Sequence, residues 1–380
     1  MSTPNQSNEK IRVLVVDDSA FIRRLMTDIL SADREIEVVG TACDAFKARE
    51  AIKSLNPDVI TLDVEMPGMD GIQFLSNLMR LRPMPVVMCS TLTEHGASVT
   101  LEALELGAID FVQKPTAFSA EALREYSEEV TTKVKSAACS TVRGRSGPGP
   151  RRRTAASHEI PSATEKFTAD AILPRVIPRV SAPTEVVVAI GASTGGTEAI
   201  RAVLVDLPED SPAIVIAQHI PKAFSGPFAR RMDASCALNV MEAEDGQPVS
   251  AGSVYIAPGD RHLLLVREGG RYRCRLSDGP PVQRHKPSVD VLFRSVAQAA
   301  GANAVGVMLT GMGRDGAECM KEMREAGATN IAQDEATSVV WGMPGAAYEV
   351  GGVHSLHPLH QIAGKILELA AVQGRTRRVS

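Results

Sequence analysis

The sequence of 380 residues lacks several features that define large classes of proteins. Its six cysteines are scattered and form no C-x-x-C pair, so a disulfide framework and a zinc site lack support, and reduced thiols are expected. No apolar run approaches the roughly 18 residues that cross a bilayer, and the opening MSTPNQSNEK has no apolar signal core. The formal net charge of −4 gives nucleic acid or membrane no bulk attraction. We therefore expect a cytoplasmic protein without nucleic-acid partners or membrane insertion.

The sequence does contain two blocks in which strand-like apolar runs alternate with helical patterns. This alternation predicts an α/β fold with a doubly wound parallel sheet in each block. The first block, 10–130, has five strands, and the second, 185–376, includes a β-hairpin insertion within SVYIAPGDRHLLLVREGGRYRCRLSDG. Residues 131–184 are rich in Ser, Pro, Gly and Arg, which is typical of a flexible linker. We interpret the basic run Arg151–Arg153 in this linker as a solvated charge cluster.

Charged side chains gather at the strand ends of the first block. In open α/β sheets, sites form at the carboxyl ends of the strands. Strand one ends at Asp17 and Asp18, strand three at Asp63, and strand five at Lys114, which precedes a proline. Three carboxylates repel one another unless a cation joins them, and hard oxygen ligands suit Mg²⁺. A carboxylate beside Mg²⁺ and a lysine can attack phosphorus, because both cations stabilise the equatorial oxygens.

These strand-end residues make the first block resemble a response-regulator receiver domain. The resemblance implies that Asp17 and Asp18 hold Mg²⁺ together with Asp63, and that Asp63 is the phosphoacceptor. It places the switch hydroxyl on Ser90, with Thr91 as the alternate. It also makes Lys114 a part of the same switch. It also implies a histidine kinase as the phosphodonor.

The second block opens on the stretch VVVAIGASTGGTEAI, in which a strand leads directly into a glycine-rich turn at Ser193. The turn fits G-x-S-x-G, the strand-to-helix elbow that exposes a nucleophilic serine. It fits neither the Walker pattern nor G-x-G-x-x-G, so a phosphate-binding loop is disfavoured. The motif is weak on its own, because small residues also allow close packing of a strand on a helix.

A nucleophilic serine needs a base and an acid that orients the base. His219 ends the next strand, in AIVIAQHIP, so we expect it to neighbour Ser193. Two aspartates follow later strands, Asp315 in LTGMGRDGA and Asp334 in IAQDEAT, and the residues alone leave the choice between them open. The order Ser, His, Asp differs from that of α/β-hydrolases and disfavours that superfamily.

Several further stretches of the second block carry a resemblance to the catalytic domain of chemotaxis protein-glutamate methylesterases. They include AIGASTGGTEAI, QHIP, YIAPGDRH, DGPPVQRHKPSVDVLF, TGMGRDGA and AQDEATSVVWGMP. The resemblance implies a triad of Ser193, His219 and Asp315, and so selects Asp315 over its rival. Thr194 and Met312 flank this site and are candidate oxyanion or positioning groups.

The two resemblances together imply a phosphorylation-regulated hydrolase. The family removes methyl esters from glutamates of methyl-accepting chemotaxis receptors, deamidates selected receptor glutamines, and needs no cofactor for the ester reaction. Its receiver domain covers the esterase site until phosphorylation, although the long linker here lowers the effective concentration of such a cover. The competing hypothesis is an output domain that only docks on partners or DNA. A DNA reader would need a helix-turn-helix and a basic face, which this block lacks, and a docking module would not need the triad.

Overall fold

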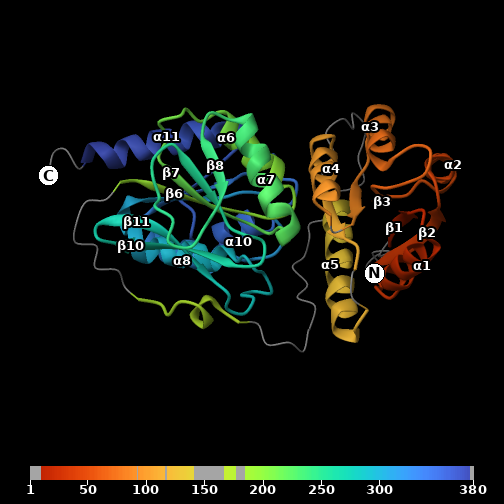
Figure 1. Cartoon of the computed structure of the whole chain (residues 1–380), viewed down its shortest axis with the longest axis horizontal. Helices are drawn as coiled ribbons and strands as arrows, with labels where there is room; N and C mark the ends of the chain where they lie inside the picture. Colours follow the sequence, from red (N-terminus) through yellow and green to blue (C-terminus); the bar gives the residue numbers. More distant parts are fainter. Residues whose placement is uncertain (1–9, 92, 116–117, 141–166, 177–184, 377–380) are drawn as a thin grey trace, which may run out of the picture. The chain divides into compact units, whose positions relative to one another are not determined.

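The computed structural model describes residues 10–91, 93–115, 118–140, 167–176 and 185–376 (Figure 1). The chain divides into two units, Met1–Ala156 and Ser157–Ser380. Both are α/β, as the alternation of strands and helices predicts. Within the described residues, we find no helix that combines the length and the apolar character needed to cross a membrane.

The first unit is built on a five-stranded sheet in the order β2-β1-β3-β4-β5, and every neighbouring pair is parallel. The predicted doubly wound five-stranded fold is confirmed. The strand order reverses between β1 and β3, which is where open sheets of this kind form their sites. The strands are β1 (Ile11–Val16), β2 (Ile36–Ala42), β3 (Val59–Asp63), β4 (Val86–Ser90) and β5 (Asp110–Gln113).

Four helices connect these strands and a fifth follows β5, and each begins at a side chain that accepts a hydrogen bond from a backbone N–H of the first turn. Such N-caps satisfy one of the donors that a helix start leaves unpaired. The caps are Ser19, Asp44, Asp70, Thr93 and Ser119. The helices are α1 (Ala20–Ser31), α2 (Ala45–Leu55), α3 (Gly71–Leu81), α4 (Glu94–Glu105) and α5 (Ala120–Cys139).

Helix α5 passes residue 130, where we predicted the first domain to end. Val130, Val134 and Ala137 are fully buried along its inner face. Their spacing of three to four residues is helical, but the Ser, Thr and Ala between them made this stretch resemble linker. Most of the predicted linker, including Arg151–Arg153, lies outside the described residues.

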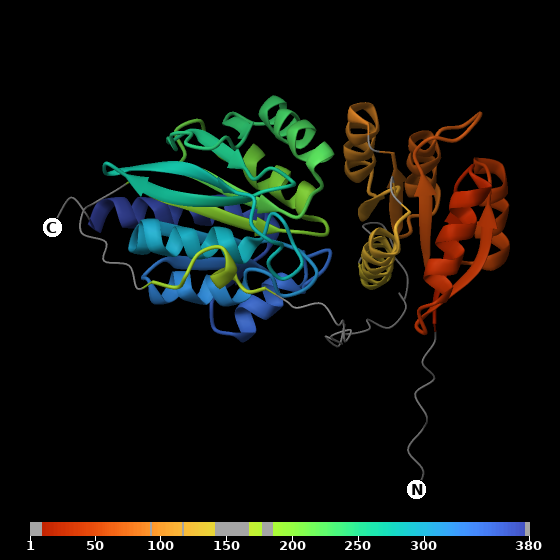
Figure 2. The same ribbon diagram turned by 60° about the horizontal axis from the view of Figure 1, so that its bottom comes forward.

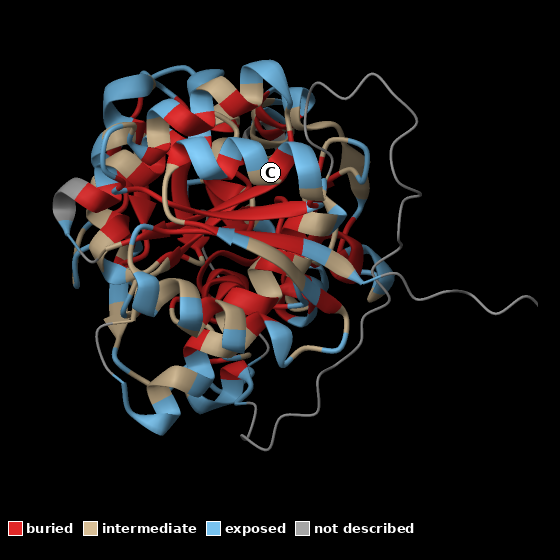
Figure 3. Cartoon of the chain, turned by 90° about the vertical axis from the view of Figure 1, so that its right-hand side faces the viewer, coloured by how far each residue is buried: buried red, intermediate tan, exposed pale blue. Residues whose placement is uncertain are grey.

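The second unit has a seven-stranded sheet in the order β14-β13-β12-β6-β7-β9-β8, again with parallel neighbours throughout. A doubly wound parallel sheet is confirmed here too. The central strands β6, β7 and β12 are buried along their whole length, whereas the edge strands β8 and β14 are partly exposed. Figure 3 shows buried strands inside the fold and exposed residues on the outer sides of the helices. The strands are β6 (Val187–Ala192), β7 (Ala213–Gln218), β8 (Asn239–Glu242), β9 (Ser253–Ile256), β12 (Ala304–Met308), β13 (Thr329–Gln333) and β14 (Ser355–His357).

The predicted hairpin insertion is present as β10 (His262–Glu268) and β11 (Arg271–Ser277), which pair antiparallel. Gly269 and Gly270 form its two-residue turn with φ of 58° and 82°, the left-handed values that such turns require. The stretch SVYI, which we included in the insertion, instead forms β9 of the main sheet.

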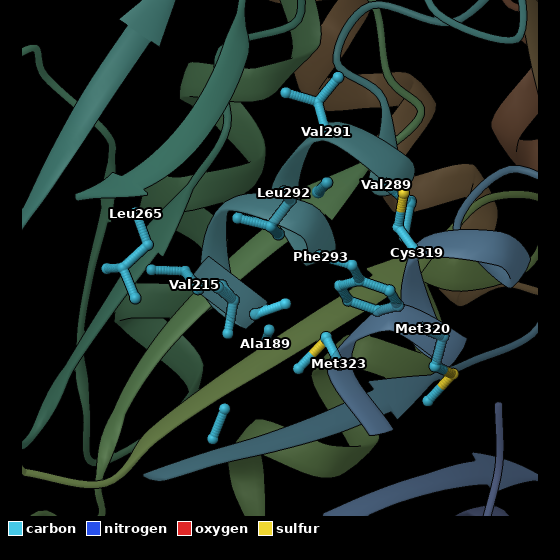
Figure 4. Close-up of a cluster of buried hydrophobic side chains, with 14 of the residues drawn as sticks. Ala189, Val215, Leu265, Val289, Val291, Leu292, Phe293, Cys319, Met320 and Met323 are labelled. Atoms are coloured by element: carbon cyan, nitrogen blue, oxygen red, sulfur yellow. The ribbon is translucent and has the colours of Figure 1, made fainter. Parts of the chain in front are cut away.

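Helix α8 (Val289–Ala300) is buried on nearly all sides and forms a platform for the rest of the unit. It contacts β6, β7, the hairpin strand β10 and helix α9. Figure 4 shows its Leu292 and Phe293 among side chains from those elements: Ala189, Val215, Leu265, Met320 and Met323. The remaining helices are α6 (Gly196–Val205), α7 (Lys222–Ser235), α9 (Ala317–Glu325), α10 (Met343–Glu349) and α11 (Leu359–Thr376).

Residues 167–176, which we assigned to the linker, pack onto the second unit. They include a short 3₁₀ turn, Ala169–Ala171, and Ala169 is only 2% exposed. Ile172 and Leu173 pack against the same buried cluster. Described residues of the second unit therefore lie before the predicted boundary at residue 185.

Candidate functional site

The first unit brings Asp17, Asp63 and Lys114 together at the carboxyl edge of its sheet. The Lys114 Nζ lies 2.8 Å from Asp17 Oδ2 and 2.8 Å from Asp63 Oδ1. Asp18 is exposed beside them, and one carboxylate oxygen from each of the three aspartates lies within 4.8 Å of the others. The predicted cluster of carboxylates and one ammonium is thus present in space.

Burial dominates the electrostatics of Asp63. It raises the pKa of this carboxyl to about 6, and the charge of Asp17 adds to the rise while Lys114 opposes it. Asp63 Oδ2 is buried and has no hydrogen-bond partner among the described protein atoms. A buried oxygen without a partner is costly, so this set of oxygens suits a divalent cation that would satisfy them.

The two candidate switch hydroxyls lie at the end of the neighbouring strand β4. Ser90 is fully buried, and its Oγ donates to Gly96 O at 3.3 Å. Thr91 is half-buried, with its Oγ1 3.5 Å from a carboxylate oxygen of Glu65. The Ser90 carbonyl accepts the Lys114 N–H at 2.7 Å, so the main chain joins the two strand ends directly.

In the second unit, the side chains of Ser193, His219 and Asp315 form one hydrogen-bonded line. His219 Nδ1 lies 3.1 Å from Ser193 Oγ, and His219 Nε2 lies 2.8 Å from Asp315 Oδ2. The histidine side chain is 9% exposed and the aspartate side chain 1%. The nitrogen that faces the carboxylate carries the proton, so the serine faces the unprotonated nitrogen, here Nδ1.

Neighbouring strands place these residues, because each follows the carboxyl end of a strand of the same sheet. Ser193 follows β6, His219 follows β7, and Asp315 lies in the loop after β12. The main chain joins the three ends: Ser193 N donates to Thr310 O at 3.1 Å, and His219 N donates to Ala192 O at 3.2 Å. The fold therefore fixes the backbone from which the three side chains project.

Asp315 is anchored by the N-terminus of α8. Its carboxylate accepts hydrogen bonds from the N–H groups of Val289 and Asp290 at 2.8 and 3.1 Å, and from Ser288 Oγ at 2.8 Å. Burial alone raises the pKa of Asp315, but the hydrogen bond and charge of His219, the charge of His285 and the N–H of Val289 together lower it. A helix N-terminus favours negative charge, so Asp315 stays ionised. We did not predict this anchor, although Ser288 before VDVLF is a typical N-cap.

Asp334, the rival for this position, is engaged elsewhere. Its Oδ1 accepts hydrogen bonds from the N–H and the hydroxyl of Thr337, at 2.9 and 2.6 Å. It therefore shapes the turn after β13. The sequence motifs alone did not decide whether Asp315 or Asp334 partners His219. In the structure, Asp315 is the one that contacts His219.

Gln218 also braces the site, a role that the sequence does not indicate. Its Nε2 donates to the carbonyls of Ser193 and His219 at 3.0 and 3.2 Å. Its Oε1 lies so close to Gly196 that a Cβ added there would sit 2.1 Å away. Gly195 adopts φ of 74°, a left-handed value that suits glycine. The glycines of the turn thus allow tight packing around the serine.

Thr194 follows Ser193 in the chain, and Met312 follows Gly311, whose backbone lies close to the serine. Thr194 is buried, and its carbonyl accepts the Thr310 hydroxyl at 3.1 Å. Met312 is half-buried and follows Gly311, where an added Cβ would lie 2.8 Å from Ser193 Cβ. Both are next to the site, as expected, and their functional roles remain predictions.

The ring of His285 stacks on the ring of His219. The ring centroids are 3.7 Å apart and the ring planes differ by 12°. His285 belongs to the polar and basic stretch DGPPVQRHKPS. The contact joins residues 66 positions apart, so no local pattern could have revealed it.

Comparison with known proteins shows to which family this chain belongs. Residues 188–366 match the family model described as CheB methylesterase, and residues 13–126 match that of the response regulator receiver domain. A protein-glutamate methylesterase/protein-glutamine glutaminase of Hydrogenovibrio crunogenus is 54% identical over 371 residues, covering 95% of this chain and 99% of its own length. The chain belongs to the CheB methylesterase family. Its first unit is a response regulator receiver domain, and its second unit is the family's methylesterase domain.

Other relatives cover the same two parts. A protein-glutamate methylesterase/protein-glutamine glutaminase 1 of Geobacter metallireducens is 52% identical over 97% of this chain and 98% of its own. The solved CheB methylesterase catalytic domain of Thermotoga maritima is 37% identical, covers 49% of this chain and 100% of its own, and has a TM-score of 0.48. The response regulator domain of Thermotoga maritima CheB is 45% identical, covers 34% of this chain and 97% of its own, with a TM-score of 0.32.

Proposed function

We propose that this chain is a phosphorylation-regulated hydrolase that removes methyl esters from glutamate side chains of chemoreceptors. The observation that carries the proposal is the line Ser193–His219–Asp315, with distances of 3.1 and 2.8 Å, in a member of the CheB methylesterase family. A pure docking domain would have no use for a serine aligned with a base and a buried carboxylate.

The reaction begins with attack of Ser193 Oγ on the carbonyl carbon of the γ-glutamyl methyl ester. His219 Nδ1 takes the hydroxyl proton as the C–O bond forms, and then gives this proton to the departing methoxide, which leaves as methanol. The acyl-enzyme is hydrolysed by a water whose proton passes through the same nitrogen, and the glutamate carboxylate is released. The same steps applied to a glutamine side chain release ammonia, so we propose glutaminase activity as well.

Asp315 orients the imidazole and stabilises the imidazolium that forms when the serine proton is taken. For the tetrahedral oxyanion, the N–H of Ser193 is already donated to Thr310 O at 3.1 Å. We therefore assign stabilisation of the oxyanion to backbone N–H groups of the turn after the serine, at Thr194, and to the neighbourhood of Met312. No cofactor enters this chemistry.

The receiver domain supplies the regulation. Asp63 is the proposed phosphoacceptor, with Ser90 or Thr91 and Lys114 as the switch residues. Asp17, Asp18 and Asp63 would hold Mg²⁺, and the buried partnerless Oδ2 of Asp63 supports this assignment. When bound, Mg²⁺ offsets the negative charge on the oxygens of the incoming phosphoryl group. A histidine kinase is the proposed donor, and the phosphoryl charge at Asp63 would shift the β4–α4 loop that carries the switch hydroxyl.

Methanol release from methylated receptor membranes tests the function. We expect wild-type protein to release methanol, and a small-molecule phosphodonor with Mg²⁺ to raise the rate. Ser193→Ala should abolish release while leaving phosphorylation of Asp63 intact, and Asp63→Asn should abolish only the rise. Methanol release by Ser193→Ala would refute the nucleophile, and equal rates with and without phosphodonor would refute the regulation. No release by any variant would favour a docking output.

A further inference from the structure

Residues 167–176, which we call the strap, run along α8. Figure 1 shows it as the yellow-green segment beneath α8, and Figure 2 shows it crossing the same helix from another direction. The buried Arg294 of α8 binds it twice, through Asp170 Oδ1 at 2.8 Å and the Leu173 carbonyl at 3.1 Å. The same guanidinium is held by Glu322 of α9 at 2.6 and 2.9 Å. The strap is therefore docked on the core of the unit.

The first residue of the strap pairs with a tight turn, Val282–His285. The Phe167 carbonyl accepts the Gln283 N–H at 3.0 Å, and Phe167 forms an isolated parallel bridge with Val282. Val282 and His285 exchange both backbone hydrogen bonds, at 3.0 and 2.8 Å. The strap thus holds this turn by main-chain contacts between residues more than 110 positions apart in the sequence.

The turn is strained without such support. Gln283 and Arg284, its two central residues, have φ of 49° and 68°. Left-handed values are unfavourable for a residue with a Cβ. Backbones of this kind persist where the surrounding structure holds them, and the strap lies against this turn.

His285 ends the turn, and its ring lies flat on His219. A ring centroid distance of 3.7 Å leaves the His219 imidazole no room to tilt toward that side. The imidazole must keep its two nitrogens aimed at Ser193 and Asp315 in one plane. A flat neighbour on one face restricts the tilt that would break either hydrogen bond.

We propose that His285 is a positioning residue for His219, and that the docked strap holds it in place through the turn Val282–His285. The last described segment before β6 is then part of the machinery that aligns the base. This inference rests on the proposed function, because it assigns His219 the role of that base. The residues involved act on the catalytic histidine and need not touch the substrate.

The test uses the full chain and separates kcat from KM. Activity is measured as methanol release from methylated receptors, and also as Ser193-dependent hydrolysis of p-nitrophenyl acetate. We expect His285→Ala to lower kcat roughly 10- to 100-fold, the range expected for a misplaced catalytic group, with KM within about twofold of wild type. His285→Phe keeps a flat ring and should retain most of the kcat. Equal losses in the Ala and Phe variants, or full kcat in His285→Ala, would overturn the role of the stack.

The strap is tested separately with Ala169→Glu, which places a charge at a position that is 2% exposed. Hydrogen exchange should show the strap released, and kcat should fall as in His285→Ala. The double variant should be no slower than the slower single variant, because both act through one contact. Val176→Glu is the matched control, since Val176 is 61% exposed on the same segment and should keep its kcat.

A released strap with unchanged kcat would overturn the coupling. If Ala169→Glu does not fold, Asp170→Asn weakens the contact with Arg294 without burying a new group. We expect it to give a smaller fall in kcat, and unchanged kcat with increased exchange of the strap would again contradict the proposal. Failure of the proposed function is distinguishable, because it would remove methanol release while leaving Ser193-dependent hydrolysis of p-nitrophenyl acetate and its dependence on His285.

Discussion

The N–H of Val289, the first residue of α8, donates a hydrogen bond to Asp315 Oδ2 at 2.8 Å. The same oxygen lies 2.8 Å from His219 Nε2. The N-terminus of a buried helix therefore holds the carboxylate that orients the proposed base. Because α8 packs against the sheet, the hairpin and α9, the carboxylate shares the rigidity of the core.

The first prediction concerns this carboxylate. Asp315→Asn should lower kcat by roughly 10³- to 10⁴-fold, because an amide cannot accept from the helix N–H groups and His219 together and favours the wrong tautomer. Methanol release under saturating substrate measures the effect. Asp334→Asn is the control, since Asp334 binds Thr337 and not His219, and its kcat should stay within about threefold of wild type. The reverse ranking of the two variants would contradict the assignment.

Gln218 provides a second prediction. Its amide joins the carbonyls of Ser193 and His219, so Gln218→Leu removes the brace while keeping similar volume. We expect kcat to fall roughly tenfold or more as the serine and the histidine lose alignment. Thermal unfolding should change less than activity, which circular dichroism melts would show. A variant with wild-type kcat would mean that the strand ends align the serine and the histidine without the Gln218 amide.

The glycine turn gives a third prediction. In Gly196→Ala, the new Cβ would lie 2.1 Å from Gln218 Oε1 and 2.8 Å from Ala192 Cβ. Overpacking of this kind costs about 1–3 kcal/mol, so both stability and activity should fall. Gly364→Ala on the exposed side of α11 meets no atom within 4 Å. It should instead stabilise the protein by up to about 1 kcal/mol, because alanine favours a helix. Denaturant unfolding of both variants gives the comparison.

The receiver site gives a prediction of pH dependence. Burial raises the pKa of Asp63 to about 6, from an ordinary value of 3.8. A carboxyl whose pKa is higher in the folded state binds protons more tightly there, so its contribution to stability is lost as pH rises from about 4 to about 6. Asp63→Asn removes the buried charge and should stabilise the receiver at pH 7 by up to ~3 kcal/mol. The difference from wild type should vanish near pH 4.

Thermal melts in EDTA across pH 4–8 check this prediction. EDTA keeps divalent cations away from the carboxylates, so the variant and the wild type are compared without metal. Asp18→Asn serves as the control, because Asp18 is exposed beside the same site and its removal relieves less buried charge. If the stabilisation by Asp63→Asn grew as the pH falls, the burial of a charged Asp63 carboxylate could not be its cause.

Much of the fold follows from patterns within the sequence. The alternation of apolar runs with helical spacing predicted both sheets, because a βαβ unit can bury its strands only under crossover helices. The boundaries were less accurate. Helix α5 continues to Cys139 through residues of low hydrophobicity, and the strap was assigned to the linker because its burial depends on Arg294 and the core beneath it.

The sequence by itself determined which residues meet at each sheet edge. Parallel strands collect their carboxyl ends on one side, so Asp17 and Asp63, like Ser193 and His219, could be paired from their positions at strand ends. The tertiary structure alone decided what surrounds them. The α8 N-terminus at Asp315, the Gln218 brace and the ring of His285 on His219 join residues far apart in the chain or depend on the close approach of backbone atoms. No local periodicity encodes such contacts, because they arise only when the packed elements set the distances between them.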